Sequence, residues 1–419
     1  MRILRVFLII PIMLIVIEAA HPALPEGQSL NVLIEEAIEN NPGVQAAYEK
    51  WKAAVYKITQ ASAFPDPMAK YGYFFDTPET RVGPQEQKAG ISQKVPFIPK
   101  LGLKATAQLK NAKIHKEKYE AVKREIIKNT KLVYYDIYWV DKAIQITEEE
   151  KSVLENLEKV AQRKYESNLA PQQDVIKAQV ELTELINTLF ILRQNRQSLE
   201  ARMNSILNRP RDSVIETATD IQPVKFDYGL VSLREMARES RQELLAANFG
   251  VEKAKYEKSI ATFDYIPDIT LGVDYVQVQE GYTRQREDGK DAWMGMIQVN
   301  VPIWFDRLGA KLNEKKAALQ SSKKNYEDIK NIVDYEVEDL HYKIASYWDI
   351  YLLYKTALVP QAEQSFDAAR TGYETGRVDF LNWLDSERML LRTRLAYYRA
   401  IVDYLKSVAH LERIVGRDL

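Results

Sequence analysis

The sequence predicts a mainly α-helical protein with a small β part, built as two duplicated halves that each run helix, β-hairpin and long helix. Three observations predict this class. Short motifs recur about two hundred residues apart. Two stretches of about sixty-five residues carry a charged, helical pattern, and four short segments alternate between apolar and polar residues.

The repeated motifs surround prolines and a tyrosine. The pairs are Phe64-Pro65-Asp66-Pro67 with Ile266-Pro267-Asp268, Lys94-Val95-Pro96-Phe97 with Asn300-Val301-Pro302-Ile303, and Tyr165-Glu166-Ser167-Asn168 with Tyr373-Glu374-Thr375-Gly376. A repeat of this length is too long for a solenoid unit and indicates a duplicated half-molecule. We therefore predict a first repeat over residues 23–215 and a second over residues 216–419.

Residues 1–22 predict an export signal. Arg2 and Arg5 precede an apolar run over residues 6–17, and small residues follow it. An uncleaved membrane anchor is the alternative, but this run is short for crossing a bilayer. We therefore expect the mature chain to leave the cytoplasm.

The composition excludes several classes of site. Lys and Arg number 58 against 59 Asp and Glu, which gives no electrostatic case for nucleic acid. Cysteine is absent, so disulfides, thiolate metal sites and a cysteine-linked lipid anchor are excluded. The four histidines show no ligand spacing, and known catalytic motifs are missing. We expect no enzyme activity, metal site or cofactor, and we interpret Glu148-Glu149-Glu150 as a solvated helix face.

The first element of each half is a helix. Ser29 is a candidate N-cap for a helix over residues 31–61, which Asn41-Pro42-Gly43 is expected to break or join. Its counterpart is expected over residues 232–262.

Four strands follow, two in each half, at about residues 67–76, 87–96, 268–279 and 291–302. In the third, one side carries Ile269, Leu271, Val273 and Tyr275, and the other carries Thr270, Gly272 and Asp274. This alternation predicts one apolar and one polar face. The polar segments Thr77–Gln87 and Glu280–Asp291 are expected to form solvent-facing loops at the hairpin tips.

Very long helices come next. Lys104–Ser167 contains neither proline nor glycine, so as one helix it would be roughly 95 Å long. The equivalent stretch Ala310–Thr375 contains Pro360, which is expected to kink or break it. Leu154, Leu157 and Val160 form a narrow apolar stripe, which indicates helix-on-helix packing of the coiled-coil type.

The strand count points to assembly. Four strands with an apolar face cannot leave their edges open, least of all in lipid. Three chains contribute twelve strands and twelve helical rods, enough for a closed barrel on a helical cylinder, although two chains would give eight strands. The strands are long enough to cross a membrane at a tilt. A soluble β-sandwich on a helical body is the alternative.

The helical turns carry a family resemblance. The second reads Tyr373-Glu374-Thr375-Gly376-Arg377, followed by Trp383-Leu384-Asp385, and the first reads Tyr165-Glu166-Ser167-Asn168, followed by Asp174-Val175. These turns, and the plan of nearly the whole mature chain, resemble the TolC-like outer-membrane efflux proteins. The resemblance implies a homotrimer with a 12-strand β-barrel in outer-membrane lipid, continued by a 12-helix periplasmic α-barrel.

The resemblance also implies function. Such a protein is the passive exit duct of a tripartite efflux pump or a type I secretion-like system. A periplasmic adaptor and an inner-membrane transporter of the RND type open it at its periplasmic tip. Two proline-rich segments, Phe64–Met68 and Gln93–Lys100, resemble the heavy-metal cation efflux branch. A periplasmic adaptor or coiled-coil scaffold is the alternative function, because adaptors also carry long helical hairpins.

Candidate site residues follow from the matched turns. The family's tunnel aspartates lie nine and twelve residues after the tyrosine, which here gives Asn382 and Asp385 as the pore constriction, with one acid kept. Asp174, Tyr373 and Arg377 are the candidate gate lock, although Arg377 lies one position earlier than the family's arginine. The adaptor is expected to dock on the tips, at Asn168, Leu169, Ala170, Gly376 and Val378.

Overall fold

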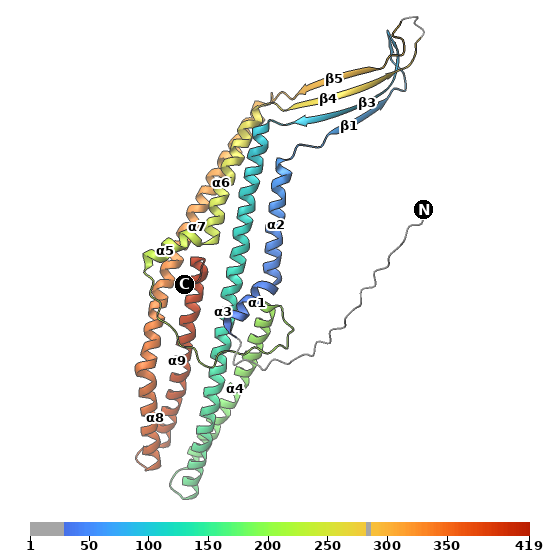
Figure 1. Cartoon of the computed structure of the whole chain (residues 1–419). Helices are drawn as coiled ribbons and strands as arrows, with labels where there is room; N and C mark the ends of the chain where they lie inside the picture. Colours follow the sequence, from blue (N-terminus) through green and yellow to red (C-terminus); the bar gives the residue numbers. More distant parts are fainter. Residues whose placement is uncertain (1–28, 282–285) are drawn as a thin grey trace, which may run out of the picture.

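A computed structural model describes residues 29–281 and 286–419 as a long, narrow molecule with strands at one end and helical turns at the other (Figure 1). The predicted signal at residues 1–22 lies outside the described residues. Within the described ranges, none of the helices has the length and hydrophobicity needed to cross a bilayer.

The elements appear in the predicted order in both halves. The first half contains α1 (Leu30–Asn40), α2 (Pro42–Ser62), β1 (Met68–Tyr73), β2 (Glu79–Thr80), β3 (Gly83–Val95), α3 (Ile98–Glu166) and α4 (Gln172–Leu207). The second contains α5 (Leu230–Ser240), α6 (Gln242–Thr262), a short 3-10 turn (Phe263–Tyr265), β4 (Ile269–Val278), β5 (Ala292–Val299), α7 (Phe305–Leu353), a π-helical turn (Tyr354–Leu358), α8 (Val359–Glu374) and α9 (Phe380–Val415).

Asn41 separates the first two helices, as the sequence predicted. Its extended backbone ends α1, and its side chain accepts hydrogen bonds from the backbone N–H groups of Gly43 and Val44 at 2.9 and 3.3 Å. Pro42 fits the first turn of α2, where its missing N–H leaves no helical bond unmade. Ser29 occupies the N-cap position of α1, but its side chain makes no capping hydrogen bond.

The four long strands form one antiparallel sheet in the order β1-β3-β4-β5 (Figure 1). The predicted faces are confirmed by the register, which pairs Ala89 with Tyr275 and Tyr275 with Trp293. The apolar face is open to the surroundings, and Trp293 is 75% exposed. On the opposite face, Asp274 lies buried between the ammonium groups of Lys70 and Lys88, at 3.2 and 2.9 Å.

The first hairpin tip is smaller than the sequence predicted. The segment Thr77–Gln87 was expected to be a loop, but β3 already begins at Gly83 and pairs with the short β2. Gly83 turns the chain with a φ of 120°, and a Cβ there would lie 1.9 Å from the carbonyl oxygen of Gln279. Backbone pairing with β4 therefore extends further than the polar composition indicated. The second expected loop, Glu280–Asp291, falls partly outside the described residues.

The two long rods differ as predicted. α3 runs without interruption through 69 residues, which corresponds to roughly 100 Å. In the second half, α7 ends at Leu353, and a π-helical turn separates it from α8, whose second residue is Pro360. Proline lacks the N–H needed for the i−4 bond, and the wider π turn relieves the clash of its ring with the preceding carbonyl groups.

The rods pack in pairs around narrow apolar stripes. Near the helical turns, Leu154 and Leu157 of α3 are fully buried in one cluster together with residues of α4, α8 and α9, and Val160 packs against it. The predicted packing of helix on helix is therefore confirmed, and its coiled-coil type stays a prediction. At mid-length, the segment between α4 and α5 is pinned by tyrosine hydroxyl groups, since Ala218 N–H donates to Tyr134 and Phe226 N–H to Tyr404.

Candidate gate at the helical tips

Two equivalent turns close the helical end of the molecule. α3 ends at Glu166, and Asn168 takes a left-handed φ of 56°. α8 ends at Glu374, and Gly376 takes a φ of 75°. Residues in this conformation commonly end helices, because their N–H groups satisfy the last free carbonyl groups. The matching positions explain why asparagine in one half stands where glycine stands in the other.

The candidate docking residues lie on these turns. Asn168, Leu169 and Gly376 are exposed, and Ala170 and Val378 are half-buried. Leu169 is 76% exposed, which is high for an apolar side chain at the end of a charged rod. The tips therefore present a small apolar surface to a partner, and their use in docking stays a prediction.

Tyr373 is the centre of the second turn. Its ring is buried against Phe380 and Trp383, with ring centroids 5.8 and 5.0 Å away. The helices α3 and α4 form a first helical hairpin, and α8 and α9 form a second. From the first helical hairpin, Lys164 donates a hydrogen bond to the Tyr373 carbonyl group, and its ammonium lies 4.1 Å from the ring centroid. This contact joins the two hairpins, and sequence reasoning missed Lys164, since it resembles the exposed lysines around it.

The candidate lock is assembled only in part. Asp174 is half-buried near Tyr373; burial raises the pKa of Asp174, Lys177 opposes the rise and Asp379 adds to it. Burial and the nearby Asp174 raise the pKa of Tyr373 to about 12. Arg377 is exposed, and within the described part of a single chain no ion pair joins it to Asp174. The geometry thus brings Asp174 and Tyr373 together, while the contribution of Arg377 to a lock stays a prediction.

The candidate constriction residues share one face of α9. Asn382 and Asp385 lie three residues apart and are both exposed, so their side chains project from the same side of the helix. The Asn382 N–H donates to the capping carboxylate of Asp379 at 2.8 Å. Asp385 is 68% exposed, and its carboxylate lies 3.7 Å from the guanidinium of Arg388. This arrangement suits a pore-facing acid, and the pore role itself stays a prediction.

Buried carboxyl groups lie further along the rods from the tips, where the sequence predicted none. Glu150 was interpreted as part of a solvated face, but it is only 2% exposed, and Glu387 of α9 is 1% exposed. The sequence did carry a signal. Glu387 lies three residues after Leu384 and three before Leu390, on the apolar stripe of α9, and Glu150 precedes Leu154 on the stripe of α3.

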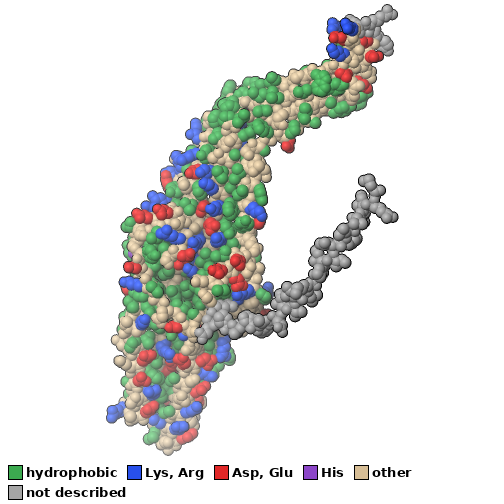
Figure 2. Space-filling model, in the orientation of Figure 1, with side chains coloured by type: hydrophobic (Ala, Val, Ile, Leu, Met, Phe, Trp, Pro, Cys, Tyr) green, Lys and Arg blue, Asp and Glu red, His purple; other side chains and the backbone are tan. Residues whose placement is uncertain are grey.

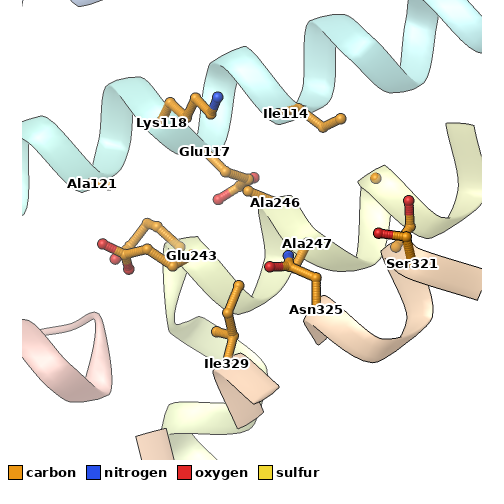
Figure 3. Close-up of a pocket in the computed structure, with 13 residues that line it drawn as sticks. Ile114, Glu117, Lys118, Ala121, Glu243, Ala246, Ala247, Ser321, Asn325 and Ile329 are labelled. Carbon is orange, nitrogen blue, oxygen red and sulfur yellow. The ribbon is translucent and has the colours of Figure 1, made fainter. Parts of the chain in front are cut away.

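Further from the tips, a cavity of about 500 Å³ lies between α3, α6 and α7 (Figure 3). Glu117 and Glu243 are among the residues that line it; burial raises the pKa of Glu117, and Arg413 binds Glu243. In the ranges that the structure describes, no group of three or more His, Cys, Asp or Glu side chains could hold a metal ion. Charged side chains of both signs are spread over the helical body (Figure 2).

Comparison with known proteins shows which family and which solved structures the chain is similar to. The family model for outer membrane efflux proteins matches residues 33–209 and 233–417, one segment in each half. The cobalt-zinc-cadmium resistance protein CzcC of Cupriavidus metallidurans is 23% identical over 96% of this chain and 91% of its own length. The outer membrane protein TolC of Vibrio cholerae is 20% identical over 93% and 91%. The fold matches a crystal structure of CusC with a TM-score of 0.81 at 18% identity, covering 93% of this chain and 92% of that one.

Proposed function

Because this chain belongs to the outer membrane efflux protein family, it is an outer-membrane exit channel with a long periplasmic extension, and we propose that three copies form its duct. Membership in this family of channels also confirms the expectation that the chain is not an enzyme. The proposed assembly is a closed barrel of twelve strands, continued by a cylinder of twelve helical rods.

The sheet carries this proposal. Its edge strands are β1 and β5, and its apolar face carries exposed side chains such as Tyr71, Trp293 and Ile297. In lipid, the backbone groups of an edge strand have no water to bind, so each edge must pair with another strand. One chain provides four long strands, fewer than the eight of the smallest membrane barrels. Three copies supply twelve, with β5 of each copy pairing with β1 of the next.

The helices offer matching surfaces for the same assembly. Exposed apolar side chains lie on α2, α4 and α7, among them Tyr56, Phe190 and Tyr335. Each belongs to a rod whose other side already packs within the chain. Burial of such side chains between copies stabilises an oligomer by about 25 cal/mol per Å² of apolar area. The wall of the cylinder is therefore suited to close by the same neighbour contacts as the sheet.

We assign the gate to the tips. An adaptor that contacts the turns around Leu169 and Val378 reaches both hairpins, and an inner-membrane transporter then delivers cargo to the opened end. Asp385 of three copies would converge near the axis and attract cations, since like charges at a constriction favour counter-ions. A periplasmic adaptor, the alternative function, is disfavoured because the family match covers both halves.

We propose cations of heavy metals as cargo. The name of CzcC, which aligns over nearly the whole chain, carries this proposal. The test uses a strain that lacks the gene for this chain and the same strain with the gene returned. Both are grown with cobalt, zinc and cadmium salts and, separately, with a panel of organic drugs. Restored tolerance of the metal salts alone supports cation cargo, and restored tolerance of drugs alone contradicts it.

The assembly is tested with introduced cysteines, because the native chain has none. The variants are Tyr71→Cys on β1, Trp293→Cys on β5, and the double variant. A short thiol-reactive cross-linker in isolated outer membranes is expected to join only the double variant into dimers and trimers. Each single variant is the matched control. A double variant that stays monomeric and leaves the membrane with the soluble fraction would refute the assembly.

A further inference from the structure

Two carboxyl groups face each other between the hairpins. Glu150 belongs to α3 of the first hairpin, and Glu387 belongs to α9 of the second. Both are almost fully buried at the upper border of the apolar cluster that holds the four rods together. The two carboxyl groups lie close enough for each to alter the pKa of the other. A hydrogen bond between them requires one of them to carry a proton, because two carboxylates offer only acceptors.

The surrounding cations do not neutralise the pair. Arg394 of α9 lies 2.9 Å from Glu149 and 3.4 Å from Glu150, so one guanidinium serves two carboxylates. Arg388 of α9 donates from its Nε to Glu181 of α4 at 3.0 Å, and its charge only partly opposes the rise in the pKa of Glu387. On α8, the charged side chains lie on the exposed side; these are Glu363, Asp367, Arg370 and Glu374.

Unmade hydrogen bonds mark the same place. Among the described residues, neither carboxyl oxygen of Glu387 has a hydrogen-bond donor, and Glu150 Oε2 has none. A buried ionised carboxylate without a donor is strongly unfavourable, whereas a shared proton supplies the missing bond. Burial, Glu150 and Glu181 together raise the pKa of Glu387 to about 8. Burial also raises the pKa of Glu150, and Arg394 opposes that rise.

We propose that Glu150 and Glu387 form a proton-binding site that joins the two hairpins and stabilises their closed arrangement. The inference rests on the proposed function, because it assigns the site to the gate of the channel. When the hairpins separate, water reaches both groups, and Glu387 returns toward its ordinary pKa of 4.5. The closed arrangement therefore binds the proton more tightly than the open one.

Lower pH is expected to favour the closed arrangement. Glu387 has a raised pKa in the closed arrangement, so protonation favours closure as the pH falls below about 8. The advantage grows until the pH reaches the ordinary value and is lost as the pH rises through 8. Between pH 8 and pH 6 the ratio of closed to open hairpins is expected to rise about 50-fold per subunit.

The test measures opening frequency in planar lipid bilayers at pH 6 and pH 8. The native channel is expected to open more often at pH 8. Glu387→Gln keeps the shape and can donate a hydrogen bond to Glu150 but cannot titrate, so it is expected to lose this dependence. Glu150→Gln leaves Glu387 buried, so its midpoint is expected to fall to lower pH without disappearing. Glu363→Gln, on the exposed side of α8, is the matched control and keeps the native profile.

A second readout is independent of channel activity. The infrared carbonyl band of a protonated buried carboxyl group is expected in purified native protein at pH 7 and absent in Glu387→Gln. Absence of the band in the native protein, or a native pH profile in Glu387→Gln, would overturn the inference. A protein that shows the band but never conducts would instead contradict the proposed function.

Discussion

Replacing Lys164 by methionine is expected to loosen the junction between the two hairpins of one subunit. Lys164 of α3 donates a hydrogen bond to the carbonyl group of Tyr373, and its ammonium lies 4.1 Å from the centre of that ring. Methionine keeps the length and much of the packing of the side chain. It removes the positive charge and the hydrogen-bond donor, so the change isolates those two contributions.

The magnitude follows from the two contacts. A hydrogen bond to a charged group contributes about 1.5–3 kcal/mol, and a cation–π pair at an exposed site about 0.5–1 kcal/mol. Lys164 is only half-buried, so water still screens its charge. The lower end of each range therefore applies, which gives about 2 kcal/mol in total. A loss of this size shifts the balance between joined and separated hairpins about 30-fold toward separation.

The assay is single-channel recording in planar lipid bilayers at fixed pH and salt. Lys164→Met is expected to raise the opening frequency, with unchanged conductance of the open state. Lys159→Met is the matched control, since Lys159 lies on the same helix and is exposed. If Lys164→Met opens as rarely as the control, the contact with Tyr373 does not hold the hairpins together and the reasoning fails.

Three further changes test the tips. Arg377→Glu reverses an exposed charge beside the second turn and is expected to change closed-state conductance; unchanged conductance together with unchanged adaptor binding counts against a gating role. Asp385→Asn removes one carboxylate per copy and is expected to lower the preference for cations, read as a smaller reversal potential across a salt gradient; an unaltered potential would place Asp385 outside the constriction. Trp383→Ala empties the buried site of a ring that packs against Tyr373 and is expected to cost about 3–5 kcal/mol, measured by denaturant unfolding of the helices, where a loss of under about 1 kcal/mol would contradict the packing.

The long elements were predictable because their signals are local. The absence of proline and glycine over residues 104–167 predicts an unbroken rod, and α3 is unbroken there. Pro360 predicts an interruption, although its π-helical form depends on how neighbouring rods hold the chain. The faces of the strands were predictable as well, because a period of two fixes which side chains share a face.

Contacts between the hairpins were not predictable in the same way. Lys164 and Tyr373 are 209 residues apart in the chain, and their approach depends on how two rods lie in space. A lysine next to Arg163 and Tyr165 carries no mark that separates it from its neighbours. The resemblance of the turns indicated Arg377 instead, because a motif compares positions along the chain and contains no information about the neighbouring rod.

The buried carboxyl groups show a different limit. A run of three glutamates is usually solvated, and it predicts an exposed Glu150. The position of Glu150, one turn before Leu154, indicates burial instead. A glutamate on the apolar stripe of a coiled-coil helix is the stronger signal, because burial of an unpaired charge is unfavourable and marks a special role. Glu150 and Glu387 both meet this description, as does the buried Glu181 of α4.

The long helices of the two halves differ in continuity. α3 is a single rod, whereas the second half is interrupted at Tyr354–Leu358, before α8. Bending is easiest where the regular helical hydrogen bonds are interrupted. Glu150 and Lys164 lie on the unbroken rod, and their partners Glu387 and Tyr373 lie beyond the interruption. Both contacts therefore connect an unbroken rod to the hairpin that carries the π-helical interruption. We expect loss of either the shared proton or the lysine charge to favour opening of that hairpin.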